Sequence, residues 1–488
     1  MRKNLTRGLW TPLLCIGMLL LSGCGHGSAI TGPGSGFSTA CTACTVGGTV
    51  TGLSANESVT LLDNGGNSLT ANTDGTFMFS SALAGGSRYD VTVQSHTPGI
   101  SCAVSNGAGT VGTHEVANIL VNCAAGTETV LYAFAGGPTD GADPQGTLAL
   151  GSSGTLYGTT YRGGTDGLGT VYQLSSAGGE TVLYAFAGGA TDGADPRAGP
   201  ILGSSGTLYG TTYGGGADGL GTVYQLGSAG GETVLYSFAG GASNGADPRG
   251  SLIIDSAGNL YGTTSGGGAS GLGTVYEVSP TGAQTVLYSF AGGTTDGEVP
   301  LGHLVMGSGG SLYGTTSTGG AYDLGTVFRI SLGGVETVLY SFAGTTTHDG
   351  AYPRAGLIMD GSGDLYGTTS AGGTYDLGTV FEISASGTET VLHSFAGGTT
   401  DGSDPNGSLL LGSSGSLYGT TSTGGAYDLG TVFKLSSDGT EVLLHSFAGG
   451  TTDGSSPKAG LIVDSAGNLY GTTSAGGVND DGTVFELN

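Results

Sequence analysis

The phrase LYGTT occurs seven times in the second part of the chain, at an almost constant spacing. The tyrosines of the seven copies are Tyr157, Tyr209, Tyr261, Tyr313, Tyr366, Tyr418 and Tyr470. Successive copies are 52 residues apart, except for one interval of 53. A fixed period of this length is typical of solenoids, propellers and other repeat arrays. The greater part of the chain is therefore built from one repeated unit.

One period, taken from residues 356–395, contains four short runs that favour β-strands. The runs are GLIMD, LYGTTS, GTVFEIS and TETVLHSF, and Gly, Ser and Asp separate them. Runs rich in Val, Ile, Thr, Tyr and Phe between such turn residues are typical of strands. No run has a helical period, and 104 glycines disfavour helices. We number the four strands of each repeat first to fourth; together they predict a four-stranded propeller blade in an all-β fold.

The two ends of the repeat region predict how the blades are arranged. The region begins with a fourth strand at 128–134, and its last residues, 482–487, form a third strand. An open array would leave these strands as unpaired edges, which proteins avoid. We therefore expect residues 125–488 to form a seven-bladed β-propeller. The N-terminal strand would complete the last blade in a three-plus-one closure.

The first 40 residues have the pattern of an export signal and a linker. A basic start (MRKNLTR) precedes an apolar run of about a dozen residues, which is too short to span a membrane and typical of a signal peptide over 1–23. The segment LSGC resembles the bacterial lipobox, which predicts lipidation of Cys24; an ordinary signal peptide is the alternative. Because Gly25 and not Asp follows Cys24, we expect the lipid to anchor the protein in the outer membrane or at the cell surface. Residues 24–40 are predicted to be a flexible tether.

Residues 41–124 are predicted to form a small β-sandwich ahead of the repeats. Apolar and polar residues alternate in VGGTVTGL, DGTFMF and YDVTVQ, and turn residues separate these runs. The segment resembles Ig-like modules of bacterial surface proteins, which implies a stalk. Because Cys102 and Cys123 flank two predicted strands, we expect them to form a disulfide, which leaves Cys41 to pair with Cys44. A redox CxxC site at Cys41 and Cys44 is the alternative.

The chain is strongly acidic, and most of its acidic residues lie in the repeats. The net charge is −26, and the repeat region carries 32 of the 37 acidic residues but 7 of the 11 basic ones. Such a balance argues against nucleic acid and anionic lipid headgroups as partners of the repeats.

Two sets of loops, which join fourth to first strands and second to third strands, should open on the same face. Both sets are rich in aspartate: Asp140, Asp143, Asp192, Asp195, Asp296, Asp401, Asp404, Asp166, Asp218, Asp323, Asp376 and Asp428. Convergent carboxylates suit Ca²⁺ or a polyol. The alternative is that each Asp stabilises a turn. The spacing of these aspartates does not match an EF-hand loop. We therefore expect no cofactor, with Ca²⁺ as the alternative.

Departures from the repeat give the candidate binding site. The 53-residue interval contains AGTTTHDGAYPRAG, which places His348, Asp349, Tyr352 and Arg354 close together in sequence. Only three second-to-third loops carry a Tyr before the Asp, in the pairs Tyr322–Asp323, Tyr375–Asp376 and Tyr427–Asp428. Aromatic rings beside carboxylates suit carbohydrate or protein ligands. Drift between repeats is the alternative explanation.

No catalytic constellation can be recognised in the sequence. His303 interrupts a first strand without a readable Ser, Cys or Asp partner. His393 and His445 replace the Tyr of VLYSF, which we interpret as an exchange of aromatic residues within a packed sheet. Four basic residues directly follow a proline in the fourth-to-first loops, and we interpret them as neutralising nearby carboxylates; they are Arg197, Arg249, Arg354 and Lys458.

The repeats resemble a known family through three segments: LGTVFEIS (377–384), ETVLYSFAG (336–344) and GNLYGTTSAGG (467–477). They are similar to the Gloeo/Verruco (GloVer) tandem repeat of anchored bacterial surface proteins. The resemblance implies export and surface anchoring and supplies no catalytic residues. We therefore expect a surface-anchored binding or scaffold protein that is not an enzyme. The alternatives are a hydrolase or lyase with its site at the channel mouth, and a structural or adhesion protein.

Overall fold

The protein is all-β. The computed structural model describes residues 41–227, 230–412 and 415–488. In this part of the chain the only helix is a 3₁₀ turn, η1 (Gly344–Thr347). The predicted signal peptide, Cys24 and the tether at 24–40 lie outside the described residues. None of the described helices is long and apolar enough to cross a membrane.

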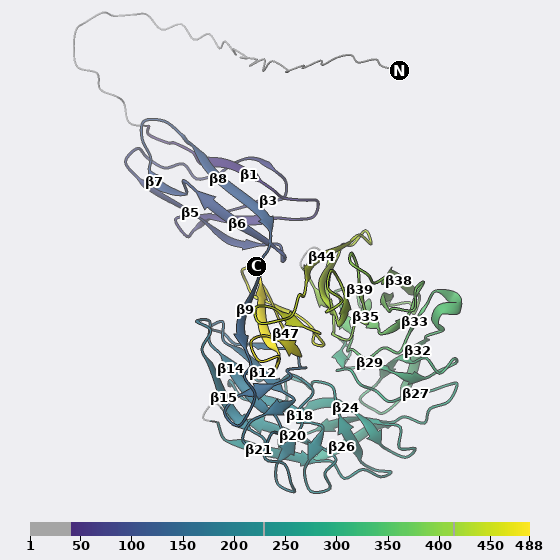
Figure 1. Ribbon diagram of the computed structural model, residues 1–488. Helices are drawn as coiled ribbons and strands as arrows, with labels where there is room; N and C mark the ends of the chain where they lie inside the picture. Colours follow the sequence, from purple (N-terminus) through teal and green to yellow (C-terminus); the bar gives the residue numbers. More distant parts are fainter. Residues whose placement is uncertain (1–40, 228–229, 413–414) are drawn as a thin grey trace, which may run out of the picture.

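Residues 46–125 form two four-stranded sheets that share one core (Figure 1). The first sheet has the order β4 (Gly75–Met78), β1 (Val46–Thr51), β8 (Val116–Ala125) and β6 (Ile100–Ser105). The second has the order β3 (Asn67–Ala71), β2 (Val59–Asp63), β5 (Arg88–His96) and β7 (Ala108–Thr110). Val50 and Ile119 of one sheet and Leu61 of the other are fully buried in the common core. The two sheets form a sandwich because both bury their apolar faces in it.

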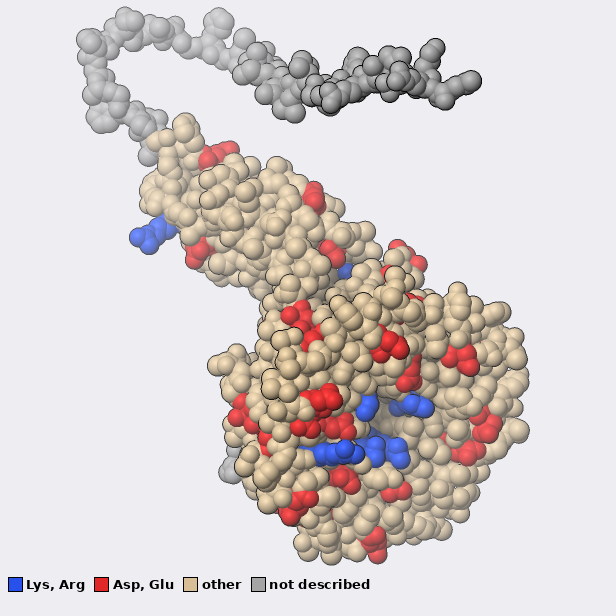
Figure 2. Space-filling model, viewed as in Figure 1, with Lys and Arg blue, Asp and Glu red and all other residues tan. Residues whose placement is uncertain are grey.

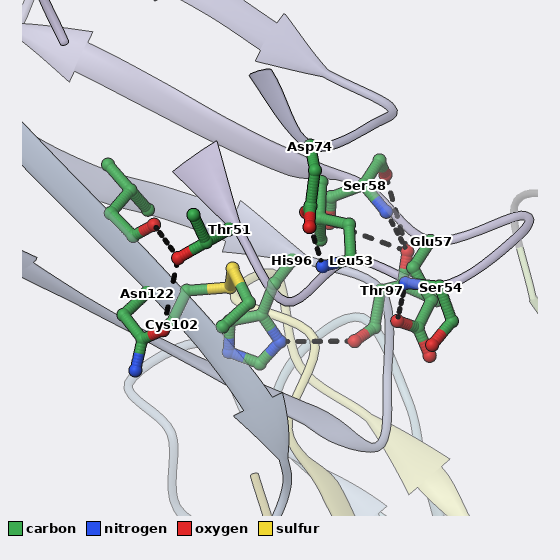
Figure 3. Close-up of a disulfide and its surroundings, with 12 residues drawn as sticks. Thr51, Leu53, Ser54, Glu57, Ser58, Asp74, His96, Thr97, Cys102 and Asn122 are labelled. Carbon is green, nitrogen blue, oxygen red and sulfur yellow. Dashed lines mark hydrogen bonds between the residues drawn. A yellow bond between two sulfur atoms is a disulfide. The ribbon is translucent and has the colours of Figure 1, made fainter. Parts of the chain in front are cut away.

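Both predicted disulfides are present. Cys102 on β6 is bonded to Cys123 on β8, and the two residues lie opposite each other in the sheet. Cys41 is bonded to Cys44. The redox alternative for the second pair has no support from the geometry, since Cys44 is completely buried. Figure 3 shows Cys102 near Asn122, whose side-chain oxygen accepts the Thr51 hydroxyl, and also the turn in which the Glu57 carboxylate accepts the backbone N–H of Ser54.

A four-stranded antiparallel sheet recurs in every repeat, as the sequence predicts, and Figure 1 shows these sheets following one another around a common centre. The first strands are β11 (Ala149–Leu150), β17 (Ile201–Leu202), β23 (Ile253–Ile254), β28 (Val305–Met306), β34 (Ile358–Met359), β40 (Leu410–Leu411) and β46 (Ile462–Val463). The second strands, which carry LYGTT, are β12 (Leu156–Thr160), β18 (Leu208–Thr212), β24 (Leu260–Gly267), β29 (Leu312–Thr316), β35 (Leu365–Thr369), β41 (Leu417–Thr421) and β47 (Leu469–Thr473).

The third and fourth strands complete each sheet. The third strands are β14 (Thr170–Leu174), β20 (Thr222–Leu226), β25 (Thr274–Val278), β31 (Thr326–Ile330), β37 (Thr379–Ile383), β43 (Thr431–Leu435) and β49 (Thr483–Leu487). The fourth strands are β15 (Glu180–Ala185), β21 (Glu232–Ser237), β26 (Gln284–Ser289), β32 (Glu336–Ser341), β38 (Glu389–Ser394), β44 (Glu441–Ser446) and β9 (Glu128–Ala133). Here β9 comes first in the chain yet lies beside β49, with Glu128 opposite Leu487 and Ala133 opposite Thr483.

Short strands join the two loop sets of each repeat, so these loops lie side by side on one face. Most of them are two-residue pairs: β10 (Gly141–Ala142) with β13 (Arg162–Gly163), β16 (Gly193–Ala194) with β19 (Gly214–Gly215), β27 (Gly297–Glu298) with β30 (Thr318–Gly319), β33 (Gly350–Ala351) with β36 (Ala371–Gly372), β39 (Gly402–Ser403) with β42 (Thr423–Gly424), and β45 (Gly454–Ser455) with β48 (Ala475–Gly476). In the remaining repeat β22 (Gly245–Pro248) pairs with the extended β24. The single extra residue of the 53-residue interval is absorbed by η1.

Neighbouring sheets pack through an aromatic contact that repeats around the domain. The Phe that follows a fourth strand meets, edge to face, an aromatic ring on the third strand of the next sheet. The pairs are Phe134–Tyr172, Phe186–Tyr224, Phe238–Tyr276, Phe290–Phe328, Phe342–Phe381, Phe395–Phe433 and Phe447–Phe485, with centroids 5.0–5.2 Å apart. Each of these rings is fully buried. Such contacts stabilise by more than the area that they bury.

A threonine hydrogen bond accompanies each aromatic contact. The last-but-one residue of each LYGTT strand donates its hydroxyl to a carbonyl in the next repeat. The pairs are Thr159–Ala198, Thr211–Gly250, Thr263–Gly302, Thr315–Ala355, Thr368–Gly407, Thr420–Ala459 and Thr472–Gly146. In the last pair a residue near the C-terminus bonds to a residue of the first repeat.

The sandwich contacts the last repeats through polar groups. The Lys434 ammonium lies 3.7 Å from the Glu57 carboxylate, and both side chains are largely buried. The backbone N–H of His96 donates to the carbonyl of Ala466, and the Tyr418 hydroxyl donates to that of Pro98. A buried ion pair that loses one partner leaves an uncompensated charge, so this contact fixes the orientation of the sandwich on the repeats.

We expect Phe134→Ala to cost as much stability as Phe342→Ala, about 3–5 kcal/mol each, because both rings are fully buried in equivalent inter-sheet contacts. Guanidinium unfolding of the full chain measures both losses, and Val335→Ala on an exposed turn is the control. If β9 were a frayed terminal strand, Phe134→Ala would be close to neutral while Phe342→Ala would still be costly.

Candidate functional site

A pocket at the common centre of the sheets is lined by three consecutive residues from every repeat. The triplets are 145–147, 197–199, 249–251, 301–303, 354–356, 406–408 and 458–460. Each begins two residues after the left-handed position in the loop that joins a fourth strand to the next first strand. The middle residue is Gly or Ala in every triplet, because the backbones of neighbouring repeats meet there: a Cβ on Gly146 would lie 2.1 Å from the backbone nitrogen of Gly199. Some third positions are equally close to a neighbour, since a Cβ on Gly199 would lie 1.7 Å from the Thr147 carbonyl oxygen. The first position varies most and gives the pocket its charge.

The first position of the triplet is cationic in four of the seven repeats. These residues are Arg197, Arg249, Arg354 and Lys458, and the other three repeats have Gln145, Leu301 and Asn406. Figure 2 shows the basic side chains gathered around the central hollow, with acidic residues scattered over the surface around them. More than half of the seven basic residues of the repeat region therefore lie at one opening of an otherwise acidic domain.

Two of these arginines are held by tyrosine rings. The Arg197 guanidinium lies 4.6 Å from the ring centre of Tyr161 and 4.7 Å from that of Tyr213, and Arg249 lies 4.9 Å from Tyr213. Arg197 also donates to the Tyr161 hydroxyl. Stacking of this kind orients a guanidinium while its N–H groups stay available. The buried Nε atoms of Arg197 and Arg249 have no hydrogen-bond partner in the protein.

Aspartates lie just behind the cations but pair with them loosely. Lys458 is 3.9 Å from Asp143, and Arg354 is 4.0 Å from Asp404. Burial raises the pKa of Asp195, although Arg197 opposes the shift. The pocket therefore has a cationic inner ring, formed by Arg197, Arg249, Arg354 and Lys458. Asp143, Asp195 and Asp404 surround it and partly neutralise its charge.

His303 lies in the wall of the central pocket, and it has a partner that the sequence did not reveal. Its Nδ1 is 3.3 Å from the Ser408 hydroxyl, 105 residues further along the chain. This partner could not be found in the sequence, because it comes from a distant repeat whose triplet lines the same pocket. Burial lowers the pKa of His303, which favours the neutral imidazole.

The predicted Tyr–Asp pairs lie on the same face as the pocket mouth. Tyr322, Tyr375 and Tyr427 are among the most exposed large side chains of the described residues, each about three-fifths exposed. The aspartates that follow them, Asp323, Asp376 and Asp428, adopt left-handed backbone conformations and accept the backbone N–H groups of Gly319, Gly372 and Gly424 at 2.9–3.0 Å. These carboxylates close their own turns, as the turn hypothesis predicts.

The four candidate residues of the 53-residue interval lie in different environments and do not form one site. His348 caps η1 in a left-handed conformation and is exposed. Tyr352 occupies the left-handed position that is Asp143 in the first repeat, and 39% of it is exposed. Arg354 lines the central pocket. Asp349 is 4% exposed and accepts the Tyr340 hydroxyl and two backbone N–H groups.

The bonding of Asp349 is shared by a ring of buried aspartates: Asp140, Asp192, Asp296, Asp349, Asp401 and Asp453. Each accepts a backbone N–H at the start of its loop and another from the following Gly. Four of these aspartates also accept a Tyr hydroxyl, and His393 and His445 take the place of the Tyr beside the other two. These aspartates therefore hold their loops through backbone hydrogen bonds, as the turn hypothesis predicts.

Each buried aspartate also faces a glutamate from the next sheet. Glu180 approaches Asp140, and its buried Oε1 has no hydrogen-bond partner. Burial and the Asp140 charge raise the pKa of Glu180 to about 7. In one repeat both acids are amides: Asn244 donates to the Tyr236 hydroxyl, which donates to Gln284. The paired replacement indicates that the two carboxyls act as a unit.

The sequence does contain a pattern that marks the central pocket, but the acidic residues around it make the pattern easy to miss. Four cations stand at one fixed position of the period, next to an invariant small residue. In sequence each cation directly follows a proline, in ADPR, ADPR, AYPR and SSPK, and is easily interpreted as neutralising a nearby carboxylate. Only the arrangement of the repeats shows that the equivalent positions of every repeat converge.

Comparison with known proteins identifies the repeat. The family described as the Gloeobacter/Verrucomicrobia repeat matches residues 84–309 and 300–488. The curated proteins contain no match.

Several solved structures can be superimposed on part of the chain. They include the periplasmic gluconolactonase of Pseudomonas aeruginosa (18% identity, TM-score 0.39, covering 62% of this chain and 84% of that one). The PQQ-bound aldose sugar dehydrogenase of Streptomyces coelicolor (14%, 0.38, 74% and 98%) and a puromycin hydrolase (11%, 0.44, 68% and 50%) are two others. At these TM-scores no property of the three proteins is transferred to this chain.

We expect the inter-sheet acid pairs to make stability fall as the pH rises. The pKa of each of Glu180, Glu232, Glu336 and Glu389 is raised to about 7 in the folded protein, so the stabilisation from their protonated forms is complete below pH 4.5 and lost as the pH passes 7. The groups that face Glu180 are Asp140, Tyr132 and Tyr172.

Thermal unfolding of the full chain between pH 5.5 and 8 measures this slope. Replacing the four glutamates with Gln, the residue found naturally at 284, should flatten the decline and raise the midpoint at pH 8. An identical slope in the two proteins would contradict the assignment.

Proposed function

This chain belongs to the Gloeobacter/Verrucomicrobia repeat family, and we propose that its repeat domain is a ligand-binding module that holds an anionic ligand at the mouth of the central pocket. The observation that carries the proposal is the cationic inner ring, in an otherwise acidic domain. The ligand class is an acidic carbohydrate, bound through its carboxylate or sulfate groups.

The physical argument rests on incompletely paired guanidinium groups. Arg197 and Arg249 keep a buried Nε without a partner, and stacking on tyrosine rings orients both groups. A planar guanidinium binds a carboxylate or sulfate with two parallel hydrogen bonds, which a neutral sugar cannot match. The pocket is open to solvent, and its volume of about 90 Å³ suits a single charged group. The exposed Tyr322, Tyr375 and Tyr427 on the same face would then contact neighbouring sugar rings.

The module as proposed is a seven-bladed propeller closed by its first strand. Support comes from the pairing of β9 with β49 and from the Phe134–Tyr172 contact between the last and first sheets. The bond from Thr472 to Gly146 repeats the inter-sheet bond that all earlier repeats make. A closed ring is what keeps the seven triplets at one centre, so the binding site depends on it.

We further propose that the protein is exported and anchored by a lipid on Cys24, with the Ig-like sandwich as a stalk. The lipobox-like LSGC and the following Gly/Ser-rich segment support this arrangement. An acidic domain would be repelled by anionic headgroups, so the tether and the sandwich would hold the pocket away from the membrane surface.

We expect the full chain to bind polygalacturonate or dextran sulfate and not neutral dextran. Arg197→Gln combined with Arg249→Gln should weaken binding at least about tenfold, because both stacked guanidinium groups are lost. Calorimetric titration at low and physiological salt measures the change, and the two polymers distinguish carboxylate from sulfate. Arg329→Gln, on the exposed side of β31, is the matched control. Equal binding of neutral dextran, or an unaffected double variant, would overturn the proposal.

A hydrolase is the second candidate function, favoured by the Ser408–His303 contact of 3.3 Å in the pocket wall. A neutral histidine beside a serine hydroxyl can accept its proton during attack on an ester. Among the described residues, however, His303 makes no hydrogen bond to a carboxylate that would orient it.

On the hydrolase hypothesis, a fluorophosphonate probe labels the protein and Ser408→Ala abolishes the labelling. Ser251→Ala, the same third position of another triplet, leaves it unchanged. Mass spectrometry of the labelled chain identifies the modified residue. A chain that remains unlabelled at Ser408 would exclude this hypothesis and leave the binding function.

A further inference from the structure

The residue beside each inter-sheet acid pair is Tyr or His. In four repeats a tyrosine hydroxyl bonds to the buried aspartate, and in a fifth Tyr236 bonds to Asn244. His393 and His445 occupy this position in the other two repeats, which are neighbours. An imidazole can bind a metal ion, and a protonated phenol does so poorly. The histidine repeats therefore contain a nitrogen ligand beside two carboxylates, a combination that the tyrosine repeats lack.

One of the two histidine sets is compact. A ligand atom from each of Glu128, His445 and Asp453 lies within 4.8 Å of the other two. The Nε2 of His445 is 3.2 Å from a carboxylate oxygen of Asp453. Ligands about 2.0–2.2 Å from a tetrahedral zinc ion are roughly 3.3 Å apart, so this separation matches one edge of such a site. The tyrosines bond more tightly, since Tyr340 is 2.8 Å from Asp349.

One carboxylate of this set has an unpaired oxygen, and the other is held in place by the backbone. The buried Oε1 of Glu128 has no hydrogen-bond partner in the protein. Backbone N–H groups of Ala448 and Gly454 fix the Asp453 carboxylate at 2.7 and 2.6 Å and leave it lone pairs to spare. Such backbone bonds orient a carboxylate ligand in the way that outer partners do in known metal sites. Glu128 and His445 are each partly exposed, so an ion can enter from solvent.

We propose that Glu128, His445 and Asp453 form a binding site for a divalent first-row transition metal, of which Zn²⁺ is the probe. One imidazole and two carboxylates suit this class of ion, whereas Ca²⁺ requires six to eight oxygen ligands. Two negative charges balance the charge of the ion. This site is independent of the anionic ligand at the central pocket.

The position of the site gives the metal a structural consequence. Glu128 is the first residue of β9, which pairs with β49. His445 lies on β44 and Asp453 in the following loop, both in the preceding sheet. A bound ion joins the first strand of the repeat domain to a sheet formed more than 270 residues later. A bound ion would therefore hold β9, the strand on which the proposed ring closure depends, against the preceding sheet.

The test uses the full, untagged chain after removal of metals with a chelator. Zn²⁺ at a hundredfold excess over its Kd should raise the unfolding midpoint by about 3–5 °C, and Ca²⁺ should not. His445→Tyr should abolish the Zn²⁺ shift and the calorimetric binding event. This variant should fold, because Tyr occupies the equivalent position in five repeats.

His393→Tyr is the matched control. It makes the same exchange in the neighbouring sheet, where His393 is 3.3 Å from Asp401 but the third carboxylate, Glu441, is not within the same compact set. The Zn²⁺ shift and the tight binding event should survive in it. The proposal is overturned if Zn²⁺ neither binds nor stabilises the unaltered chain, if His445→Tyr retains the shift, or if Ca²⁺ produces an equal one.

Discussion

The packing of each sheet against the next is the interaction on which the rest of the molecule depends. A buried edge-to-face aromatic pair and a threonine-to-carbonyl bond occur together at every sheet boundary, including the one between the last sheet and the first. A single sheet of this size exposes both faces and cannot bury a core alone. Stability is therefore a property of the boundaries, and this explains why the LYGTT strand varies so little: its glycine admits the ring of the third strand, and its threonine makes the bond.

The fold could be predicted largely from the sequence, because period and strand pattern are local properties. The four-stranded sheets, the placement of β9 beside β49 and both disulfides agree with expectation. The short strands that join the two loop sets were not predicted. They are two residues long, and backbone pairing between loops leaves no hydrophobic pattern to detect. The binding role of Tyr322, Tyr375 and Tyr427, the lipid anchor at Cys24 and the identity of the ligand remain predictions.

The functional site was harder to predict for a physical reason. Each cation of the inner ring is one residue in 52, and its local context suggests a surface ion pair. Convergence at a centre is a property of the whole array, so neither the Arg197–Tyr213 stacking nor the Ser408–His303 contact has a local signature. The aspartates showed the opposite effect. Their repetition suggested a cation site, but repetition also marks a structural task, and backbone N–H groups occupy them.

Function in a repeat protein of this kind has to come from positions that tolerate variation. The middle residue of each central triplet is restricted to Gly or Ala, since neighbouring backbones meet there. The third residue often contacts a neighbouring repeat as well, as in the bond from the Ser251 hydroxyl to the Gly199 carbonyl. The first residue is less restricted, and it is Arg in one repeat and Leu in another. The acid pairs vary less. Tyr or His, and Asp or Asn, occupy equivalent positions of the inter-sheet contact, and the His at 445 supplies the nitrogen ligand of the proposed metal site. The architecture therefore separates the residues that maintain the boundaries between sheets from those that vary in chemistry.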